Sequence, residues 1–232
     1  MQLFFAEDIE SDIYTLSEEE SKHCIRVLRM VTGNEIFLTD GQGTLCRCSI
    51  VDAHPKHCTV QVVERTPNYG RHPFYLHVAV APTKNNARME WFLEKAVEMG
   101  IDEITPIICQ HSERNVMKQD RLEKIAISAM KQSLKTYKPV VNAPTPLDVL
   151  LRSPFDGQRF IAYCDGDHRT PLRSLYHTGD NALILIGPEG DFSPAEVQAA
   201  LQSGFQPVTL GPCRLRTETA ALAAVAFFNL LN

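Results

Sequence analysis

Three short runs near the start of the chain have the residue pattern of β-strands. They cover residues 35–39, 45–51 and 59–63, where apolar positions alternate with polar ones or β-branched residues are frequent. Turn-forming residues separate the runs, at 40–43 (Asp-Gly-Gln-Gly) and at 54–55 (His-Pro). The pattern predicts a small β-barrel over about the first 65 residues.

A helix is expected within this region, between Ser17 and Met30. Ser17 suits the position before a helix, and Glu20 stands three residues later, which is the spacing of a capping box. Residues three apart lie on neighbouring positions of one helix face. That face carries the basic residues His23, Arg26 and Arg29.

From residue 74 onward, predicted strands alternate with predicted helices. Residues 66–73 (Thr-Pro-Asn-Tyr-Gly-Arg-His-Pro) predict a linker before this change. Alternating strands and helices are typical of a parallel sheet, so we expect an α/β fold with two domains, at residues 1–67 and 74–232. The predicted strands of the second domain cover residues 75–81, 103–109, 159–164, 182–186 and 207–210.

Two predicted helices of the second domain differ in their apolar pattern. The helix at 87–99 has one apolar stripe and is followed by Gly100, a stop signal, so we expect the stripe to be core. The last helix, at 220–231, is apolar almost all round and must be buried, within the domain or against a second copy of the chain. The stripe of the first helix consists of Met89, Phe92, Leu93, Ala96 and Val97.

Two loops that follow predicted strands, at 187–193 and 210–220, are the most informative segments. Their glycines let the backbone approach a ligand, and the helices that follow offer free N–H groups. Turns and helix caps explain part of the pattern, because residues 193–196 (Ser-Pro-Ala-Glu) form a capping box. Neither a turn nor a cap needs the charges of Glu189 and Arg216. Since ligands collect at the carboxyl ends of such strands, the two loops together predict a binding site.

Composition adds the class of protein. The chain has 232 residues, 44% hydrophobic and 22% charged, which is ordinary for a globular protein. It has no apolar run near the roughly 20 residues needed to cross a bilayer, and its start lacks the basic residues of a signal peptide. Seven cysteines without a regular spacing suit a reducing compartment. We therefore expect a cytoplasmic protein.

The formal net charge of −5 argues against a protein that coats nucleic acid through bulk electrostatics. A polyanion would have to meet a local basic face, and a helix predicted at 118–137 offers one, with an ordinary solvated surface as the alternative. The basic residues of this predicted face are Arg121, Lys124, Lys131, Lys135 and Lys138.

Common catalytic and metal signatures are missing from the sequence. No Gly-x-Gly-x-x-Gly motif, P-loop, serine nucleophile elbow or zinc-protease motif is present. Cysteine and histidine do cluster, but two of the cysteines lie in an alternating strand pattern and the spacing fits no common zinc finger, so we expect no metal. The cluster consists of Cys46, Cys48, His54, His57 and Cys58.

Several motifs, in this order along the chain, resemble the RsmE family of uridine-N3 methyltransferases of small-subunit (16S) ribosomal RNA. The resemblance covers nearly the whole chain. It rests on residues 23–29 (His-Cys-Ile-Arg-Val-Leu-Arg), Lys84, 98–101 (Glu-Met-Gly-Ile), 112–114 (Ser-Glu-Arg), 187–190 (Gly-Pro-Glu-Gly) and 215–220 (Leu-Arg-Thr-Glu-Thr-Ala).

The resemblance implies a PUA-like β-barrel domain joined to a SPOUT-type α/β methyltransferase domain whose C-terminal segment forms a trefoil knot. It also implies S-adenosylmethionine as the cofactor, a homodimer with active sites at its interface, and ribosomal RNA of the small subunit as the partner. The implied cofactor-binding residues are Cys164, Leu185, Ile186, Gly187, Glu189, Gly190, Leu210, Gly211, Leu215 and Thr217.

The same resemblance suggests the residues for catalysis and RNA binding. Arg216 would stabilise charge on a uracil carbonyl, while Glu218 or Glu189 would position the base or relay its proton. The candidate phosphate contacts are Arg26, Arg29, Arg47, Lys84, Arg88 and Arg114.

This chain departs from the family pattern at two positions. Asp191 replaces the second glycine of a Gly-Gly-Phe run, and the family's Arg-Ile-Leu-Arg run becomes Cys213-Arg214-Leu215-Arg216. Other readings stay open: a SPOUT methyltransferase acting on another RNA or atom, a non-catalytic RNA-binding or ribosome-assembly protein, and a nucleotide-dependent enzyme of an ordinary α/β fold. The missing phosphate-binding glycine motif disfavours the last of these.

Overall fold

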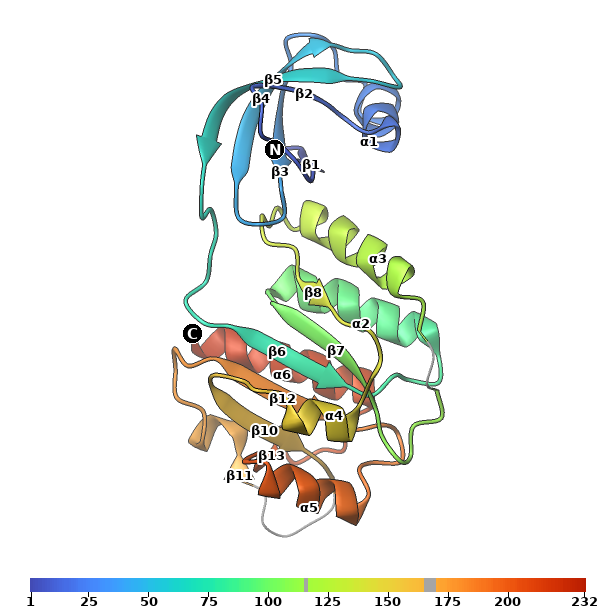
Figure 1. The fold of residues 1–232 in the computed structure, drawn as a ribbon, viewed down its shortest axis with the longest axis vertical. Helices are drawn as coiled ribbons and strands as arrows, with labels where there is room; N and C mark the ends of the chain where they lie inside the picture. Colours follow the sequence, from blue (N-terminus) through green and yellow to red (C-terminus); the bar gives the residue numbers. More distant parts are fainter. Residues whose placement is uncertain (115–116, 165–169) are drawn as a thin grey trace. The chain divides into compact units, whose positions relative to one another are not determined.

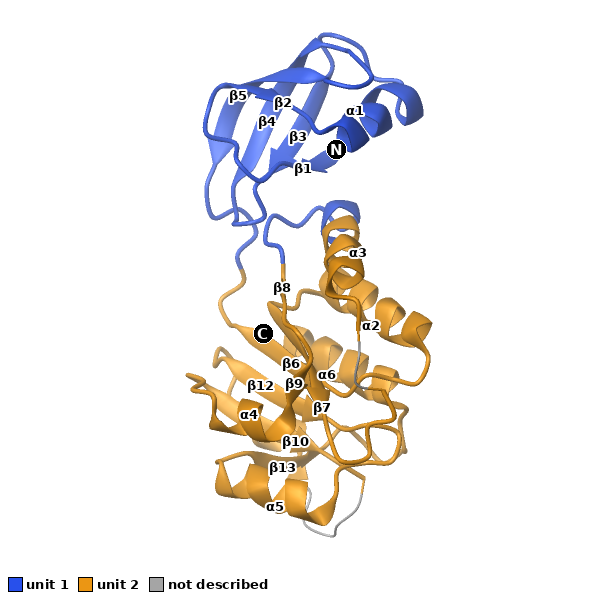
Figure 2. Cartoon of the chain, turned by 45° about the vertical axis from the view of Figure 1, so that its right-hand side comes forward, with its two compact units in different colours: residues 1–71, 130–138 blue, residues 72–129, 139–232 orange. Residues whose placement is uncertain are grey.

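A computed structural model describes residues 1–114, 117–164 and 170–232. The chain forms two compact units (Figures 1 and 2). Unit 1 consists of Met1–Arg71 together with Met130–Lys138, and unit 2 of His72–Ala129 together with Pro139–Asn232. A short segment from the middle of the chain therefore belongs to the N-terminal unit, which no sequence pattern indicated.

Unit 1 contains a five-stranded sheet with the order β1-β3-β4-β5-β2. The β3-β4, β4-β5 and β5-β2 pairs are antiparallel, whereas β1 pairs with β3 in parallel. The three strands predicted from the sequence are present. The strands are β1 (Leu3–Phe5), β2 (Ile13–Thr15), β3 (Glu35–Thr39), β4 (Leu45–Asp52) and β5 (Thr59–Thr66).

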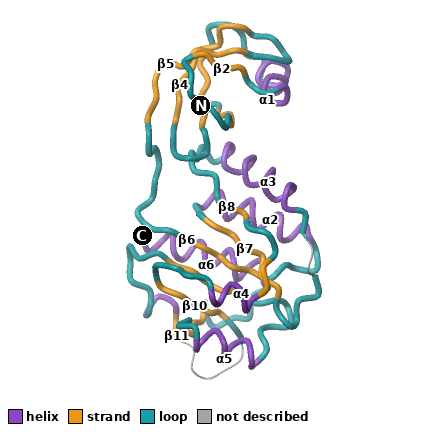
Figure 3. The backbone as a smooth tube through the Cα atoms, in the orientation of Figure 1, coloured by secondary structure: helices purple, strands orange, loops and turns teal. Residues whose placement is uncertain are grey.

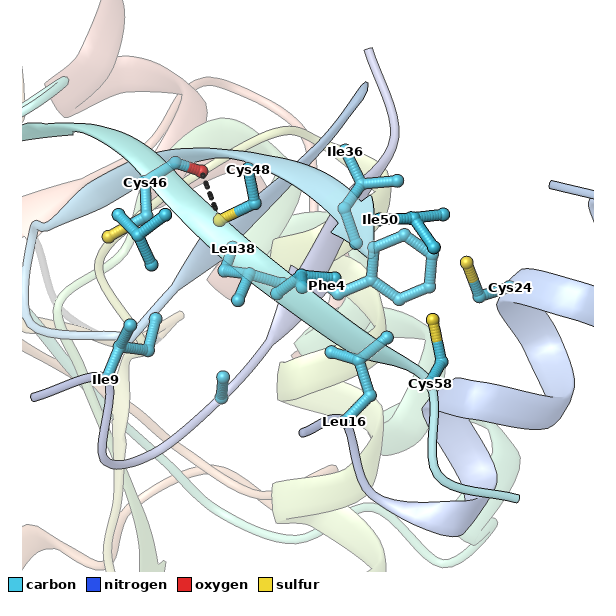
Figure 4. Close-up of a cluster of buried hydrophobic side chains, with 13 residues drawn as sticks. Phe4, Ile9, Leu16, Cys24, Ile36, Leu38, Cys46, Cys48, Ile50 and Cys58 are labelled. Carbon is cyan, nitrogen blue, oxygen red and sulfur yellow. Dashed lines mark hydrogen bonds between the residues drawn. The ribbon is translucent and has the colours of Figure 1, made fainter. Parts of the chain in front are cut away.

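The core of unit 1 lies on one side of this sheet, where alternate residues of β4 point inward (Figure 4). Cys46, Cys48 and Ile50 are fully or almost fully buried, while Arg47 and Ser49 between them are partly exposed. The two cysteines thus fill core positions, as the alternating pattern predicted. Among the described residues, no group of three or more His, Cys, Asp or Glu side chains is arranged to hold a metal ion.

The predicted helix in unit 1 is shorter than expected. Helix α1 (Glu18–Lys22) continues as one π-helical turn, η1 (His23–Val27), and ends before Met30 because Arg29 has a left-handed backbone with φ 56°. Ser17 caps the start by accepting a hydrogen bond from the Glu20 N–H, at 3.2 Å. Arg29 therefore lies outside the helix, and the prediction of one helical face holding His23, Arg26 and Arg29 was wrong.

Helix α3 (Gln119–Gln132) also ends earlier than predicted, because Leu134 adopts φ 57°. The segment that follows is bonded to the turn after β3. The Thr136 carbonyl accepts hydrogen bonds from the Gly43 N–H (2.9 Å) and from Thr39 Oγ1 (3.1 Å), and the Lys138 N–H donates to Gly41 O (2.8 Å). These bonds explain why this segment belongs to unit 1.

The single basic face predicted at 118–137 is therefore wrong. Lys135 and Lys138 lie beyond the end of α3. Arg121 is bonded to Glu90, and Lys131 Nζ lies 2.5 Å from a carboxylate oxygen of Glu20. Carboxylates neutralise two of the cations that this face was to offer to a polyanion.

Unit 2 is built on a parallel sheet with the order β11-β13-β10-β12-β6-β7-β8, and β9 pairs with β7. Every strand pair in it is parallel, which confirms the predicted α/β architecture. The strands are β6 (Leu76–Val80), β7 (Glu103–Ile108), β8 (Val140–Val141), β9 (Thr145–Pro146), β10 (Gln158–Ala162), β11 (Thr170–Pro171), β12 (Ala182–Ile186) and β13 (Gln206–Thr209).

Helices cover both faces of this sheet (Figures 1 and 3). Helices α2 (Asn86–Met99) and α6 (Thr217–Leu231) contact each other, and α6 lies on β6 and β12. On the other face α4 (Leu147–Arg152) contacts α5 (Pro194–Gln202) and β7, and a 3-10 turn, η2 (Leu172–Ser174), follows β11. The predicted apolar stripe of α2 is buried, and Gly100 ends the helix in a left-handed conformation.

Helix α6 begins at Thr217, three residues before the predicted start, and only one of its faces is buried. Leu230 is 85% exposed. Residues 210–216 connect β13 to α6, which lies on β6 and β12, so the chain passes β10 in this connection. The threading of this segment into a trefoil knot stays a prediction. None of the helices in residues 1–114, 117–164 and 170–232 is long and apolar enough to span a bilayer.

Asn181 joins the starts of three strands in unit 2. Its carbonyl accepts the Gln158 N–H at 2.9 Å, its side-chain oxygen accepts the Tyr75 N–H at 2.9 Å, and its amide nitrogen donates to Asp156 O at 3.1 Å. Gly157 passes close to this residue, with φ +153°, and a Cβ added there would lie 2.4 Å from the Asn181 carbonyl oxygen. The start of β10 next to β12 therefore requires glycine.

We expect Gly157→Ala to lower the free energy of unfolding by about 3 kcal/mol, from backbone strain plus a clash with main-chain atoms. Gly179→Ala is the matched control, because Gly179 has φ +91° but open space around it. Its free energy of unfolding should fall by only about 1 kcal/mol, from backbone strain alone. Chemical denaturation of the two variants measures the difference. Equal losses of unfolding free energy in the two variants would show that the close contact with Asn181 does not affect stability.

Candidate functional site

Three neighbouring parallel strands, β13, β10 and β12, end at the same edge of the sheet of unit 2. A cavity of about 1290 Å³ lies at this edge. Its wall combines the strand ends, the two glycine loops and residues of α6. The lining residues include Ala162, Tyr163, Cys164, Leu172, Arg173, Ile186, Gly187, Glu189, Asp191, Leu210, Gly211, Arg214, Leu215, Arg216, Thr217 and Phe227.

The first glycine loop, residues 187–193, is compact and packs on its own aromatic residue. A Cβ on Gly187 would lie 3.0 Å from the ring of Phe192, which is buried. The loop ends in the predicted capping box, which the structure confirms: Ser193 accepts from the Glu196 N–H, and the Glu196 carboxylate accepts from the Ser193 N–H at 2.8 Å. The start of α5 therefore holds one end of the loop.

Two other segments hold the middle of this loop. The Glu189 carboxylate accepts the Lys84 N–H at 3.1 Å, which ties the loop to the segment after β6. His111 Nδ1 lies 3.1 Å from Gly190 O and 3.0 Å from Asp191 O. Because both partners are carbonyl oxygens, Nδ1 must carry the proton and donate. A Cβ on Gly190 would lie 3.0 Å from His111 Cβ, so any side chain at this position would push the loop and His111 apart by a few tenths of an ångström.

The second loop, residues 210–216, is joined to the first by one buried hydrogen bond. Thr217 Oγ1, at the start of α6, donates to Gly187 O at 3.0 Å. Gly211 has φ +145°, and its backbone is bonded to Thr209 Oγ1. Arg216 is the exposed residue before the first turn of α6. The two loops that the sequence indicated are thus brought together.

Eight of the ten predicted cofactor-binding residues line the cavity. Leu185 does not line it, because it is fully buried in the apolar core under α4 and α5. Gly190 does not line it either, because it faces His111. The eight are Cys164, Ile186, Gly187, Glu189, Leu210, Gly211, Leu215 and Thr217.

The three residues predicted for catalysis are placed differently from one another. Arg216 and Glu189 line the cavity. Glu218 does not line it: it is only 7% exposed, and its carboxylate lies 3.7 Å from Nε of Arg88 on α2. A carboxylate in the first turn of a helix is also stabilised by the helix dipole.

All three predicted phosphate contacts in unit 2 have a partner within the protein. Lys84 Nζ lies 2.6 Å from Glu113, a hydrogen bond that raises the pKa of Lys84, and Arg114 donates to Asn86 at 2.7 Å. Arg88 faces Glu218. In unit 1, Arg26 and Arg29 are exposed, whereas Arg47 lies between the carboxylates of Glu35 and Glu64, both at 3.1 Å.

Sequence reasoning missed several cavity residues. Tyr163 directly precedes the predicted Cys164, and Arg173 lies in η2, a turn without any recognisable motif. Phe227 lies on a helix that is apolar almost all round, so no pattern distinguished it. For Asp191 the sequence offers one signal, its departure from the family pattern.

Comparison with known proteins gives the family. Residues 70–229 match the model of an RNA methyltransferase domain, and residues 16–63 match that of an RNA methyltransferase PUA domain. The ribosomal RNA small subunit methyltransferase E of Bacillus subtilis is 27% identical over 97% of this chain and 95% of its own length. The chain belongs to the RsmE family of RNA methyltransferases.

Solved structures of similar proteins cover the whole fold of this methyltransferase family member. A probable rRNA-methyltransferase from Porphyromonas gingivalis is 46% identical, with a TM-score of 0.93 over 100% of this chain and 98% of that one. The ribosomal RNA small subunit methyltransferase E from Neisseria gonorrhoeae, bound to S-adenosyl methionine, is 27% identical, with a TM-score of 0.90 over 100% and 98%.

The bond between Thr217 and Gly187 gives a prediction for stability. We expect Thr217→Val, which keeps the side-chain shape, to lower the free energy of unfolding by about 1 to 3 kcal/mol, because Gly187 O would be left without its partner. Thr219→Val in the same helix turn is the control, since Thr219 is exposed. Thermal denaturation that gives equal stability for both variants would contradict this role of Thr217.

Cysteine reactivity gives a second prediction for the cavity. Cys164 and Cys213 are exposed and line it, whereas the other five cysteines are buried. Burial raises the pKa of the Cys24, Cys48 and Cys109 thiols to about 12, so these are almost fully protonated at pH 8. We expect a disulfide reagent at pH 8 to modify two thiols quickly. The double variant Cys164→Ser/Cys213→Ser should lose this fast phase, and a third fast thiol in the unmodified chain would contradict it.

Proposed function

We propose that this chain is an S-adenosylmethionine-dependent methyltransferase that modifies N3 of a uridine in the 16S ribosomal RNA of the small subunit. The observation that carries the proposal is the cavity at the carboxyl ends of β10, β12 and β13, where the Thr217 to Gly187 bond joins the two glycine loops. Membership of the RsmE family, the printed names of the relatives and the S-adenosyl methionine in the Neisseria gonorrhoeae structure support it.

The residues of the cavity fit this cofactor chemically. Apolar side chains for an adenine ring stand beside backbone from both glycine loops, which can read its polar edge. Charged groups of both signs suit the sulfonium, ammonium and carboxylate groups of the methionine part. The cofactor lacks phosphates, which agrees with a sequence that lacks a phosphate-binding glycine motif. The apolar side chains are those of Leu172, Ile186, Leu210, Leu215 and Phe227.

When bound, S-adenosylmethionine supplies an already reactive methyl group. The protein then mainly has to align the acceptor nitrogen and help it lose its proton. We assign to Arg216 the stabilisation of negative charge on a uracil carbonyl, because its guanidinium is exposed at the cavity and an arginine can donate two hydrogen bonds to an anion.

We assign the handling of the N3 proton to Glu189 rather than Glu218. Glu189 lines the cavity, and the Lys84 N–H holds one of its carboxylate oxygens in place. Glu218 is buried against Arg88 and would instead position the first turn of α6, next to Arg216. Glu218 would thus have a structural role, whereas Glu189 lies at the cavity where the uracil of the RNA would bind.

RNA binding and assembly are part of the same proposal. Residues 1–67 would act as the RNA-binding domain and residues 74–232 as the methyltransferase domain, in a cytoplasmic enzyme without a metal. Arg26 and Arg29 are exposed in unit 1 and would contact RNA phosphates. Lys84, Arg88 and Arg114 would join them by exchanging their partners within unit 2 for phosphate oxygens. A second copy of the chain would cover the exposed apolar residues of α2 and α6, among them Trp91 (45% exposed) and Leu230.

We expect Arg216→Ala to retain cofactor binding and to lose about 100-fold in turnover. The reason is that Arg216 would stabilise negative charge that develops on the uracil carbonyl only in the transition state. Isothermal titration with S-adenosylmethionine and single-turnover methylation of small subunits measure the two properties. Arg152→Ala is the control, since Arg152 pairs with Asp148 on α4, outside the cavity. Wild-type turnover in Arg216→Ala would refute its role.

The acceptor atom is tested separately, in cells with and without the gene. Mass spectrometry of nucleosides from 16S ribosomal RNA should show that deletion removes one N3-methyluridine and that the intact gene restores it. A different missing nucleoside would indicate another acceptor atom. An unchanged nucleoside content together with no cofactor binding would indicate a non-catalytic RNA-binding protein.

A further inference from the structure

Asp191 has an unusual backbone for its residue type. It has φ 62°, and among the described residues only Arg29, Asn68 and Leu134 share a positive φ without being glycine. Side chains with a Cβ are disfavoured in this region, although Asp is tolerated better than most because it can form local hydrogen bonds. A chain that needed only the turn could use glycine here at no steric cost.

The carboxylate of Asp191 connects two strand ends at the cavity. One oxygen, Oδ2, accepts the Cys164 N–H at 2.8 Å, just beyond β10. The other, Oδ1, accepts the N–H of the neighbouring Phe192 at 2.9 Å. Asp191 itself follows β12, so its side chain bridges the carboxyl ends of two adjacent strands, and Asp191 and Cys164 both line the cavity.

His111 holds the same residue from another segment. Its Nδ1 lies 3.0 Å from the Asp191 carbonyl and 3.1 Å from that of Gly190. Asp191 is thus bonded through its backbone to the segment after β7 and through its side chain to the segment after β10. Asp191 therefore ties the first glycine loop to the ends of two other strands, β7 and β10.

We propose that Asp191 is a positioning residue for the methyl donor: its carboxylate holds the Gly187–Asp191 loop against the end of β10, and so sets the shape of the cavity before the cofactor binds. The proposal rests on the function proposed above. A preformed cavity binds more tightly because the loop does not have to be ordered on binding. A glycine at this position would allow the same turn without this connection.

Three substitutions separate the effect of the Asp191 side-chain hydrogen bonds from the effect of its strained backbone. Asp191→Gly keeps the turn without strain but removes both side-chain bonds, so the Kd and KM for S-adenosylmethionine should rise roughly tenfold, the loss typical of a hydrogen bond to a charged group, while kcat stays within about twofold. Asp191→Asn tolerates the same φ but presents an NH₂ group to one of the two N–H donors. Its Kd for S-adenosylmethionine should therefore lie between those of wild type and Asp191→Gly. Asp191→Ala adds strain and should bind at least as weakly as Asp191→Gly.

Isothermal titration and steady-state kinetics with S-adenosylmethionine test the series. Asp148→Asn is the control, because Asp148 is an exposed carboxylate bonded to Arg152 on α4, outside the cavity, and it should bind like wild type. A wild-type chain that does not bind the cofactor would refute the proposed function itself.

Given wild-type binding, unchanged Kd and KM in Asp191→Gly would overturn the role of Asp191 and leave the proposed function intact. A fall in kcat with unchanged KM would also overturn it. Thermal melting without cofactor separates positioning from simple stability. The melting temperature of Asp191→Gly should stay close to that of Asp148→Asn, and a large drop that accounts for the weaker binding would overturn the proposal.

Discussion

Parallel pairing of β12 with β10, and of β10 with β13, is the constraint on which the cavity depends. Parallel strands place their carboxyl ends at one edge of the sheet, so the segments that follow Ala162, Ile186 and Thr209 must meet there. Helices on both faces keep the strands buried and leave this edge as the place where backbone can face a ligand. The bond between Thr217 and Gly187 then holds the two loops together at that edge.

Charge in this protein is arranged locally. Many cations that could face a polyanion already have carboxylate partners: Arg47 with Glu35 and Glu64, Lys131 with Glu20, and Lys84 with Glu113. With a net charge of −5, the chain gains little from bulk electrostatic attraction to RNA. Under the proposed function, recognition would depend on the few exposed arginines and on the shape of the RNA.

Much of the secondary structure could be predicted, because the pattern of apolar residues reports burial directly. The strand predicted at 182–186 has those bounds, and the capping box at Ser193 starts α5 as expected. Helix ends were less predictable. Leu134 and Arg29 end or follow their helices with a left-handed backbone, and neither residue type signals a stop. After α3, tertiary bonds hold the chain in its new direction, such as those from Thr39 and Gly43 to Thr136.

The sequence by itself determined the order of strands and helices, the two glycine loops and the family, since these depend on residue type and spacing alone. Only the tertiary structure decided which loop residues reach the cavity. Leu185 turns into the core and Glu218 toward Arg88, while Arg173 and Phe227, which no motif marks, line the cavity. Asp191 is the clearest case: its sequence shows a replaced glycine, and only the fold brings its carboxylate within 2.8 Å of the Cys164 N–H, 27 residues away along the chain. This contact exists because β10 and β12 are paired neighbours in the sheet, and residue type and spacing do not say which strands become neighbours.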